Sequence, residues 1–442
     1  MGNQLRRHLK NGHRSRENSL HSTEFRSREN SLHLPTEVQV QIDILFNELT
    51  DTEGFVGYWK FQEKFGHLLS TSLWKYLHQI DGHNESLNVF RKVTEVEFRQ
   101  CAESLFTLTN DELLEILLPA DNLIRTCCEA ASISLHRDDE TWLRSLVQKM
   151  ESNGSDQESV LAWIDKTCPG ICRPIREKIA TVFSHRHSDF QQSALPSSEI
   201  LSPLQMLILC CCLPKNPYFC HPISSLVTEV EFGITWTLLN SCRQNDTLRV
   251  EKFQDDLFVY PGATVCIFEL DNHEVYAIAS DEQWRNAHEK FGGFYTVLFK
   301  LSPNFERIDG TPPTVHCNLG KIESSVYGLS YDTALQISET FSNVVALEAW
   351  GCQGKLEELE QLKTEIAELE QERQKIREQA VEHKKNGTTK KGKIEEEYIG
   401  EESTGESWKQ NVDKQLLEMA GKKFSENRRG GVNDRPADDV KR

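Results

Sequence analysis

Cysteine and histidine, the residues that bind zinc and carry thiol chemistry, gather in two short segments. Residues 210–212 are three consecutive cysteines, Cys220-His221 follows them, and Cys168 and Cys172 flank a Pro-Gly pair. Zinc sites use paired ligands at regular spacing, and no C-x₂-C pair is repeated here. Because the triplet lies inside the apolar run 207–213, we predict buried thiols and no metal.

Residues 81–92 have the length of an EF-hand calcium loop. Such a loop needs glycine at its sixth position and a bidentate glutamate at its twelfth. This chain has Ser86 and Lys92 at these positions. A lysine in place of the residue that should donate two oxygens opposes calcium binding. We therefore predict an EF-hand-like helix–loop–helix without metal, and a protein without a cofactor.

Acidic side chains near strand ends are the remaining candidates for catalysis. Asp281, Glu282 and Glu348 occupy such places, and we interpret them as solvated charges at sheet edges. The sequence has no G-x-S-x-G, H-E-x-x-H, phosphate-loop or dinucleotide motif. Thirteen cysteines keep a peroxide-consuming activity open as the alternative, although a reactive cysteine needs basic surroundings. We predict that the protein is not an enzyme.

The net charge of −18 is unevenly distributed. Residues 1–34 carry seven Lys/Arg against three Asp/Glu, whereas residues 35–354 carry 24 against 44. A body this acidic repels phosphate backbones, which argues against a nucleic-acid partner. The longest apolar run, 204–213, has ten residues, about half of what a membrane-spanning helix needs. We expect no transmembrane helix, no secretory signal and reduced thiols of the cytosol.

The pattern of apolar residues predicts an α+β chain. A helical pattern runs over 35–190, and a Ser/His/Gln-rich linker covers 184–199. From about residue 200 the pattern changes to β. Two β-rich runs flank Asp271-Asn272-His273 as a hairpin, and further strands are expected at 294–301 and 344–350. Short antiparallel strands with Pro/Gly turns predict a β-sandwich with short helices.

A heptad pattern follows the predicted sandwich over residues 354–384 and predicts a coiled-coil helix. Arg373 interrupts this apolar seam, which could pair with a second copy, with a partner helix or with its own domain. A linker at 385–405 leads to an amphipathic helix at 406–424 and a disordered tail at 425–442. The candidate partner-binding residues of the two helices are Leu359, Leu362, Ile366, Leu369, Trp408, Leu416 and Phe424, and Ile376 and Ala380 continue the seam.

An ordered series of motifs resembles the TLDc domain over residues 200–353. These are the W-T-L-L-N-S, G-A-T-V-C-I-F, A-I-A-S with Trp284, F-K-L-S-P-N-F, Y-G-L-S-Y-D and L-E-A-W-G segments that begin at residues 236, 262, 277, 299, 327 and 347. The TLDc hairpin usually has a glycine where this chain has His273. The usual glycine-rich loop before the Y-G-L-S-Y-D segment is nearly absent.

The N-terminal half is similar to one subfamily, the MTOR-associated, EAK-type TLDc proteins. Met1-Gly2-Asn3, a polar arm and Leu34-Pro35-Thr36 leading into helices carry this resemblance. It implies N-myristoylation at Gly2, residence on the cytoplasmic face of the lysosomal membrane or in the cytoplasm, and a bearing on MTOR-type growth signalling. It also implies binding to the peripheral sector of the vacuolar proton-pumping ATPase. The alternative within the resemblance is an oxidation-resistance factor whose thiols protect against peroxide.

Residues 1–34 are too polar to form a core and predict a disordered basic arm. The octapeptide RSRENSLH occurs twice and places two arginines before Ser19 and before Ser31, a spacing typical of basophilic-kinase substrates. A single acyl chain at Gly2 would hold the protein on a membrane only marginally. Basic residues of the arm would strengthen this attachment, and phosphates on Ser19 and Ser31 would weaken it. The expected membrane-facing basic residues are Arg6, Arg7, Lys10, Arg14 and Arg16.

Overall fold

The computed structural model forms two compact units, Met1–Ile366 and Ala367–Arg442. The final helix, α13, begins in the first unit and continues into the second. The structure describes residues 36–79, 90–184, 195–219, 236–243, 250–320, 326–353 and 356–388.

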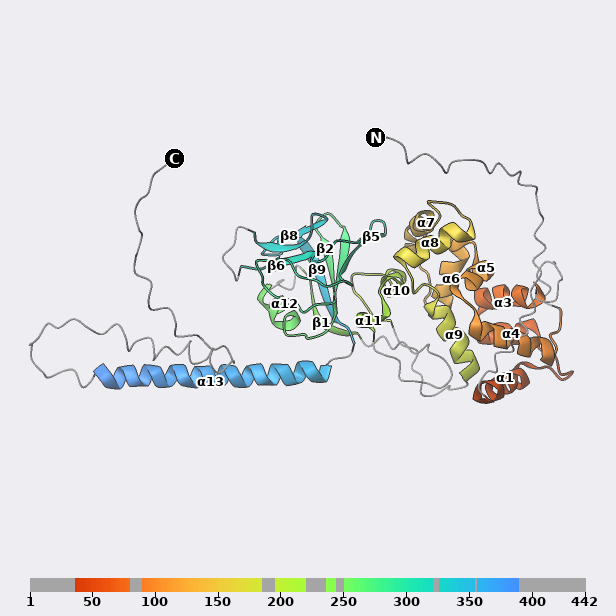
Figure 1. Ribbon diagram of the computed structural model, residues 1–442, viewed down its shortest axis with the longest axis horizontal. Helices are drawn as coiled ribbons and strands as arrows, with labels where there is room; N and C mark the ends of the chain where they lie inside the picture. The colour runs from red at the N-terminus through yellow and green to blue at the C-terminus, as the bar shows by residue number, and fades with distance from the viewer. Residues whose placement is uncertain are drawn as a thin grey trace, which may run out of the picture. The chain divides into compact units, whose positions relative to one another are not determined.

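The N-terminal part is helical, as the sequence predicted (Figure 1). Two of its helices begin with a Thr-x-x-Glu capping box, in which Thr94 pairs with Glu97 and Thr109 with Glu112. This reciprocal pairing satisfies backbone N–H groups that a helix start leaves without partners. The helices are α1 Thr36–Leu49, α2 Tyr58–Phe65, α3 His67–Gln79, α4 Glu95–Thr107, α5 Asn110–Leu117, α6 Ala120–Ala130, α7 Asp139–Met150, α8 Gln157–Thr167 and α9 Arg173–Ser184.

Short β-bridges link the loop between α1 and α2 to the segment before α4. Val56 forms bridges with both Thr50 and Val93. The ammonium of Lys92 lies 3.2 Å from the Asp51 carboxylate and also pairs with Glu53. The side chain at the twelfth position of the candidate calcium loop therefore neutralises acids of the preceding loop. Residues 81–89 lie outside the described part, so the EF-hand-like interpretation stays a prediction.

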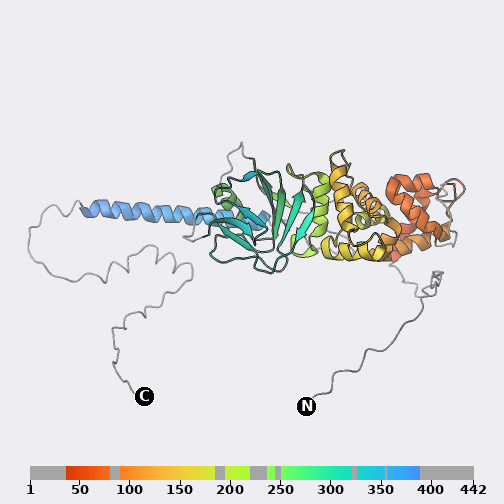
Figure 2. The same ribbon diagram turned by 90° about the horizontal axis from the view of Figure 1, so that it is seen from above.

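The β region contains two antiparallel sheets (Figure 2). The larger sheet has the strand order β1-β9-β2-β3-β4-β5, and the smaller has the order β6-β7-β8. Helices α10 Pro203–Cys212, α11 Lys215–Tyr218 and α12 Val250–Leu257 accompany them. The strands are β1 Thr237–Arg243, β2 Thr264–Leu270, β3 Val275–Ser280, β4 Val297–Ser302, β5 Glu306–Ile308, β6 Val315–Asn318, β7 Gly328–Tyr331, β8 Leu335–Ile337 and β9 Val344–Gly351.

The four inner strands of the large sheet, β9, β2, β3 and β4, are buried on both faces, which explains their nearly continuous apolar sequences. On β2, Val265 and Ile267 join a core shared with the helices, whereas Cys266 and Phe268 join the core against the small sheet. The Trp142 indole N–H on α7 donates to the Leu301 carbonyl at 2.7 Å. The predicted sandwich is therefore present, and helices cover the outer face of its larger sheet.

Two residues with positive φ angles, one in the β2–β3 hairpin and one at the start of β7, explain which residue types these positions require. His273 has φ 64°, the left-handed conformation that glycine adopts most easily, and the neighbouring Asn272 Oδ1 accepts from the Glu274 N–H. Gly328 has φ 104°, and an added Cβ there would lie 2.4 Å from the Ile337 carbonyl oxygen. The glycine of the Y-G-L-S-Y-D segment is thus required by the close approach of β8.

One strand prediction from the sequence was wrong in its starting residue. The strand expected at 294–301 begins only at Val297, and Phe294 lies in an exposed loop. Most of the linker expected at 184–199 lies outside the described residues, and near its end Ser198 and Glu199 both donate hydrogen bonds to Glu348. Helix α13, Leu356–Thr388, extends four residues beyond the predicted end and is about 50 Å long.

Candidate functional site

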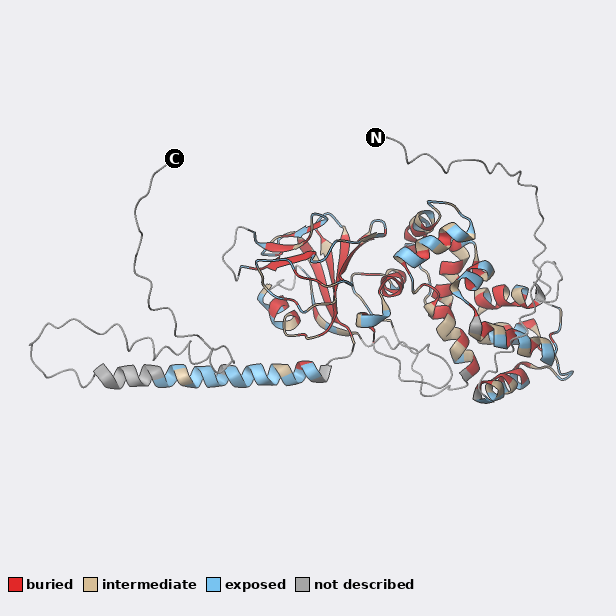
Figure 3. Cartoon of the chain, viewed as in Figure 1, coloured by how far each residue is buried: buried red, intermediate tan, exposed pale blue. Residues whose placement is uncertain are grey.

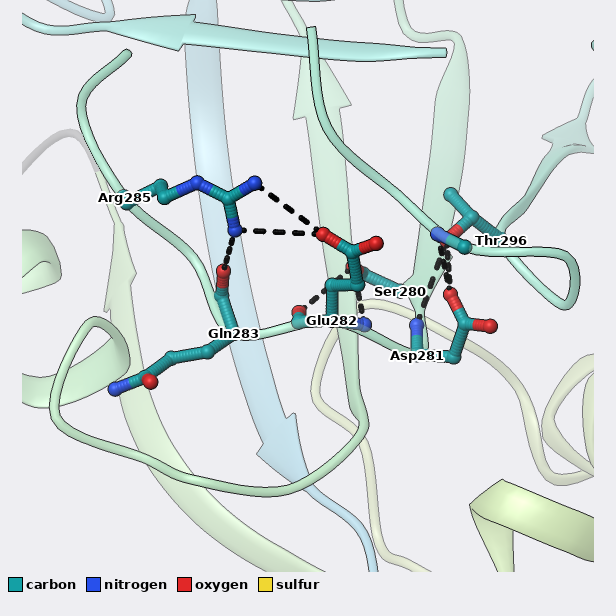
Figure 4. Close-up of polar contacts among 7 residues, drawn as sticks. Ser280, Asp281, Glu282, Gln283, Arg285 and Thr296 are labelled. Atoms are coloured by element: carbon teal, nitrogen blue, oxygen red, sulfur yellow. Dashed lines mark hydrogen bonds and ion pairs between the residues drawn. The ribbon is translucent and has the colours of Figure 1, made fainter. Parts of the chain in front are cut away.

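The turn after β3 holds the loop between β3 and β4 through one carboxylate. Asp281 Oδ1 accepts hydrogen bonds from the Gly293 N–H at 2.8 Å and the Thr296 hydroxyl at 2.6 Å. Its Oδ2 accepts from the Tyr295 N–H at 2.9 Å. Figure 4 shows Asp281 directed at Thr296, while Glu282 faces Arg285. The carboxylate of Asp281 is thus fully engaged in positioning backbone.

Residues 291–296, called the aromatic loop below, present two aromatic rings to solvent. Phe294 is 84% exposed and Tyr295 44% exposed, and the two rings meet edge to face with centroids 5.3 Å apart. The buried Tyr218 hydroxyl donates to the Tyr295 carbonyl at 2.8 Å. An added Cβ at Gly293 would lie 2.6 Å from Asp281 Oδ2, so this carboxylate requires a glycine there. The loop is a fixed platform for an exposed phenylalanine.

The turn itself is anchored by the neighbouring residues of the A-I-A-S motif and its tryptophan. The Ser280 hydroxyl donates to the Glu282 carbonyl at 2.9 Å, and the buried Trp284 indole donates to Thr264 Oγ1 at 2.7 Å. Glu282 lies 3.3 Å from the exposed Arg285 guanidinium, which also donates to the Gln283 carbonyl. The motif therefore places Asp281 where it can bind the aromatic loop.

Glu348 is a second carboxylate that positions backbone, and the interpretation of it as a solvated charge was wrong. It lies on the central strand β9 and is only 2% exposed. It accepts from the Ser198 hydroxyl at 2.7 Å, the Glu199 N–H at 2.6 Å and the Trp350 indole at 3.1 Å. Both carboxylates therefore serve the fold, and their hydrogen bonds leave neither arranged as a catalytic acid.

Seven buried cysteines come from α6, from the loop between α8 and α9, and from α10. Burial raises the pKa of the Cys128 and Cys172 thiols to about 12 each. The Cys127 thiol donates to the Ile171 carbonyl, and the Gly170 N–H donates to the Cys211 carbonyl at 2.9 Å. The thiolate is the reactive form of cysteine, and burial disfavours it at Cys128 and Cys172. The cysteines are Cys127, Cys128, Cys168, Cys172, Cys210, Cys211 and Cys212.

Glu177, on α9 near this thiol cluster, makes stability depend on pH. Burial raises its pKa from 4.5 to about 7, and Arg173 partly offsets this effect. Because the folded pKa lies above the unfolded one, the stabilisation is complete below pH 4.5 and is lost as pH rises through 7. We expect Glu177→Gln to raise the free energy of unfolding by about 1–2 kcal/mol at pH 8 and hardly at all at pH 5.

Urea denaturation at these two pH values checks this expectation. Glu158→Gln, at an exposed position of α8, is the control and should change stability little at either pH. An equal gain for Glu177→Gln at both pH values would show that its ionisation is not the cause.

Helix α13 carries the predicted seam, and its described side chains differ in exposure along the helix. Leu359 is buried and Leu362 is half-buried, whereas Ile366 is 40% exposed and Leu369 is 57% exposed. In Figure 3, the part of this helix that is coloured by burial is mostly pale blue, which marks exposed residues.

The remaining predicted site residues lie outside the described part of the chain. They are the lipidation residue Gly2, the candidate phosphorylation residues Ser19 and Ser31, the basic residues Arg6, Arg7, Lys10, Arg14 and Arg16, and the apolar residues Trp408, Leu416 and Phe424.

Sequence reasoning missed the aromatic loop. The Gly292-Gly293 pair before Phe294 was the available signal, because paired glycines mark turns rather than strand interiors.

Within the described residues, no helix is both long and apolar enough to cross a membrane. Over the same residues, no group of three or more His, Cys, Asp and Glu side chains could hold a metal ion.

A family model matches part of this chain. No curated protein matches the chain. The model of the TLDc domain matches residues 195–370, a span that contains both sheets, the Glu348-bound segment before α10 and the first turns of α13. The match thus begins five residues before the predicted boundary of 200 and extends past 353. A TLDc domain is found at residues 195–370 of this chain.

Proposed function

We propose that this protein is a non-catalytic regulator that binds the peripheral sector of the vacuolar proton-pumping ATPase. The observation that carries the proposal is the aromatic loop, in which a fixed backbone presents Phe294 at 84% exposure. Exposed aromatic side chains on rigid supports are typical anchors of protein interfaces. The choice of partner rests on the resemblance of the TLDc region to relatives that bind this pump.

The C-terminal helices provide the second contact in this proposal. The segment at 406–424, with Trp408, Leu416 and Phe424, has the pattern of a helix that fills a groove. Two linked contacts bind more tightly than either alone, because the second one forms within the same complex.

Membrane attachment belongs to the same proposal. Myristoylation at Gly2 and the basic arm would hold the protein on the cytoplasmic face of the lysosome, next to the pump. Phosphates on Ser19 and Ser31 would cancel most of the arm's positive charge and weaken the attachment. The proposed link to MTOR signalling rests on the resemblance to the EAK-type subfamily.

The alternative function is protection against oxidation, which the TLDc domain also suggests. Of the twelve described cysteines, eleven are buried and Cys242 is half-buried. Burial raises the pKa of several of these thiols, Cys317 among them, which reaches about 12. These surroundings support binding over thiol catalysis.

Replacing Phe294 tests the proposed interface. We expect Phe294→Ala to weaken binding of the full chain to purified vacuolar ATPase about tenfold or more, because a buried aromatic anchor contributes ~2 kcal/mol or more to binding. Its stability should hardly change, since the ring is exposed in the free protein. Titration of the pump by biolayer interferometry gives both affinities.

Trp59→Ala is the matched control. Trp59 is also an exposed aromatic, at 63%, and it also meets its neighbour, Tyr58, edge to face, but it lies on α2 outside the TLDc domain. The Trp59→Ala variant should therefore bind the vacuolar ATPase with the affinity of the wild type. Equal affinities for the Phe294→Ala variant and the wild type would remove the aromatic loop from the interface.

A further inference from the structure

The apolar seam of α13 carries exposed side chains. In heptad notation, Leu362 and Leu369 occupy d positions, and Ile366 occupies an a position. Ile366 and Leu369 are 40% and 57% exposed, although such side chains are stabilised by burial. The seam continues through Ile376, which is half-buried. A second helix lying along this side would cover all of these residues.

The charges beside the seam indicate which helix fits. The g positions of the first three heptads are all glutamate, Glu358, Glu365 and Glu372. Two of the three e positions are basic, Lys363 and Arg377. In a parallel two-stranded coiled coil, each g residue lies beside the e residue five positions later on the other helix. In an antiparallel pair the two g rows face each other, so glutamates would meet glutamates.

We propose that α13 pairs with α13 of a second copy of this chain as a parallel, in-register coiled coil. Glu372 then lies beside Arg377 of the second copy, and the symmetric pair forms on the other side. Glu365 meets another glutamate at position 370, which limits the strength of the dimer. This inference does not depend on the proposed binding to the pump.

Arg373 fits this arrangement better than its place in the seam suggests. It occupies an a position and is exposed. Its long stem can cover the seam while its guanidinium reaches Glu372 of the second copy. A charged residue at one a position costs stability but fixes the register and favours few strands. The seam therefore encodes a weak, specific dimer.

A charge exchange tests both the partner and the orientation. Glu372 and Arg377 are five residues apart in sequence, so they do not face each other on one helix, where neighbours are three or four apart. We expect Glu372→Arg and Arg377→Glu each to weaken dimerisation of the full chain about tenfold, because two attractive pairs become repulsive. The double variant should recover wild-type dimerisation to within about twofold. Sedimentation equilibrium measures each constant.

Two further variants make the result decisive. Glu368→Arg introduces the same charge change at an exposed c position, away from the interface, and should dimerise like the wild type. Leu369→Asp should leave a folded monomer, since that side chain is exposed before pairing. A wild-type chain that stays monomeric throughout the titration would overturn the proposal. A double variant as weak as its single variants would overturn it too, because α13 would then have another partner or orientation.

Discussion

Replacing Glu348 with alanine is expected to lower the free energy of unfolding by about 3 kcal/mol. The substitution removes the acceptor for three donors, the Ser198 hydroxyl, the Glu199 N–H and the Trp350 indole. Each buried donor without a partner costs about 1–3 kcal/mol, and water can satisfy some of them. The loss also frees the segment before α10, because Ser198 Oγ in turn accepts from the N–H groups of Ile200 and Leu201.

Thermal and urea denaturation measure this effect. Glu339→Ala removes an exposed glutamate of the same domain and should change stability by no more than about 0.5 kcal/mol. Glu348→Gln keeps one acceptor oxygen and should lie between the wild type and Glu348→Ala. Wild-type stability of Glu348→Ala would mean that these hydrogen bonds do not hold the segment.

The second large effect is expected at Asp281. Asp281→Ala should lower the free energy of unfolding by about 2 kcal/mol, because two backbone N–H groups and the buried Thr296 hydroxyl lose their charged acceptor. The aromatic loop should then lose its fixed conformation. Pump binding should fall about as far as in Phe294→Ala, although Phe294 itself is intact.

The neighbouring acid provides the matched control for this experiment. Glu282 faces the exposed Arg285 at 3.3 Å, and such a surface pair contributes less than about 1 kcal/mol. Glu282→Ala should therefore keep both stability and pump binding. Denaturation and the pump titration together give the two readouts. Unchanged binding by Asp281→Ala would show that a fixed loop is not needed.

Local signals in the sequence predicted much of the fold. The hairpin at Asp271-Asn272-His273 was predicted from residues that are close in sequence, and Asn272 and Glu274 are indeed joined by a hydrogen bond there. The heptad pattern likewise predicted α13, whose bounds differ from the prediction by two residues at one end and four at the other. Each of these features depends on residues that are close in sequence, so the pattern of residue types within a short window is enough to predict it.

The roles of the acidic residues could not be predicted, because their partners are distant in sequence. Glu348 binds groups 149 and 150 residues away. Asp281 binds the loop 12–15 residues later, and its hold on Gly293 and Tyr295 replaces the strand that the β-prone residues at 294–296 predicted. Tertiary hydrogen bonds here override local β-propensity.

The most direct measurement of the central claim is the titration of purified vacuolar ATPase with the full wild-type chain, with ATP turnover recorded in the same samples. Our account predicts saturable binding with a change in turnover, and weaker binding by a chain that ends at Gln353, which lacks the second contact. Absence of binding, together with peroxide consumption by the same protein, would contradict the account and favour an oxidation-resistance function.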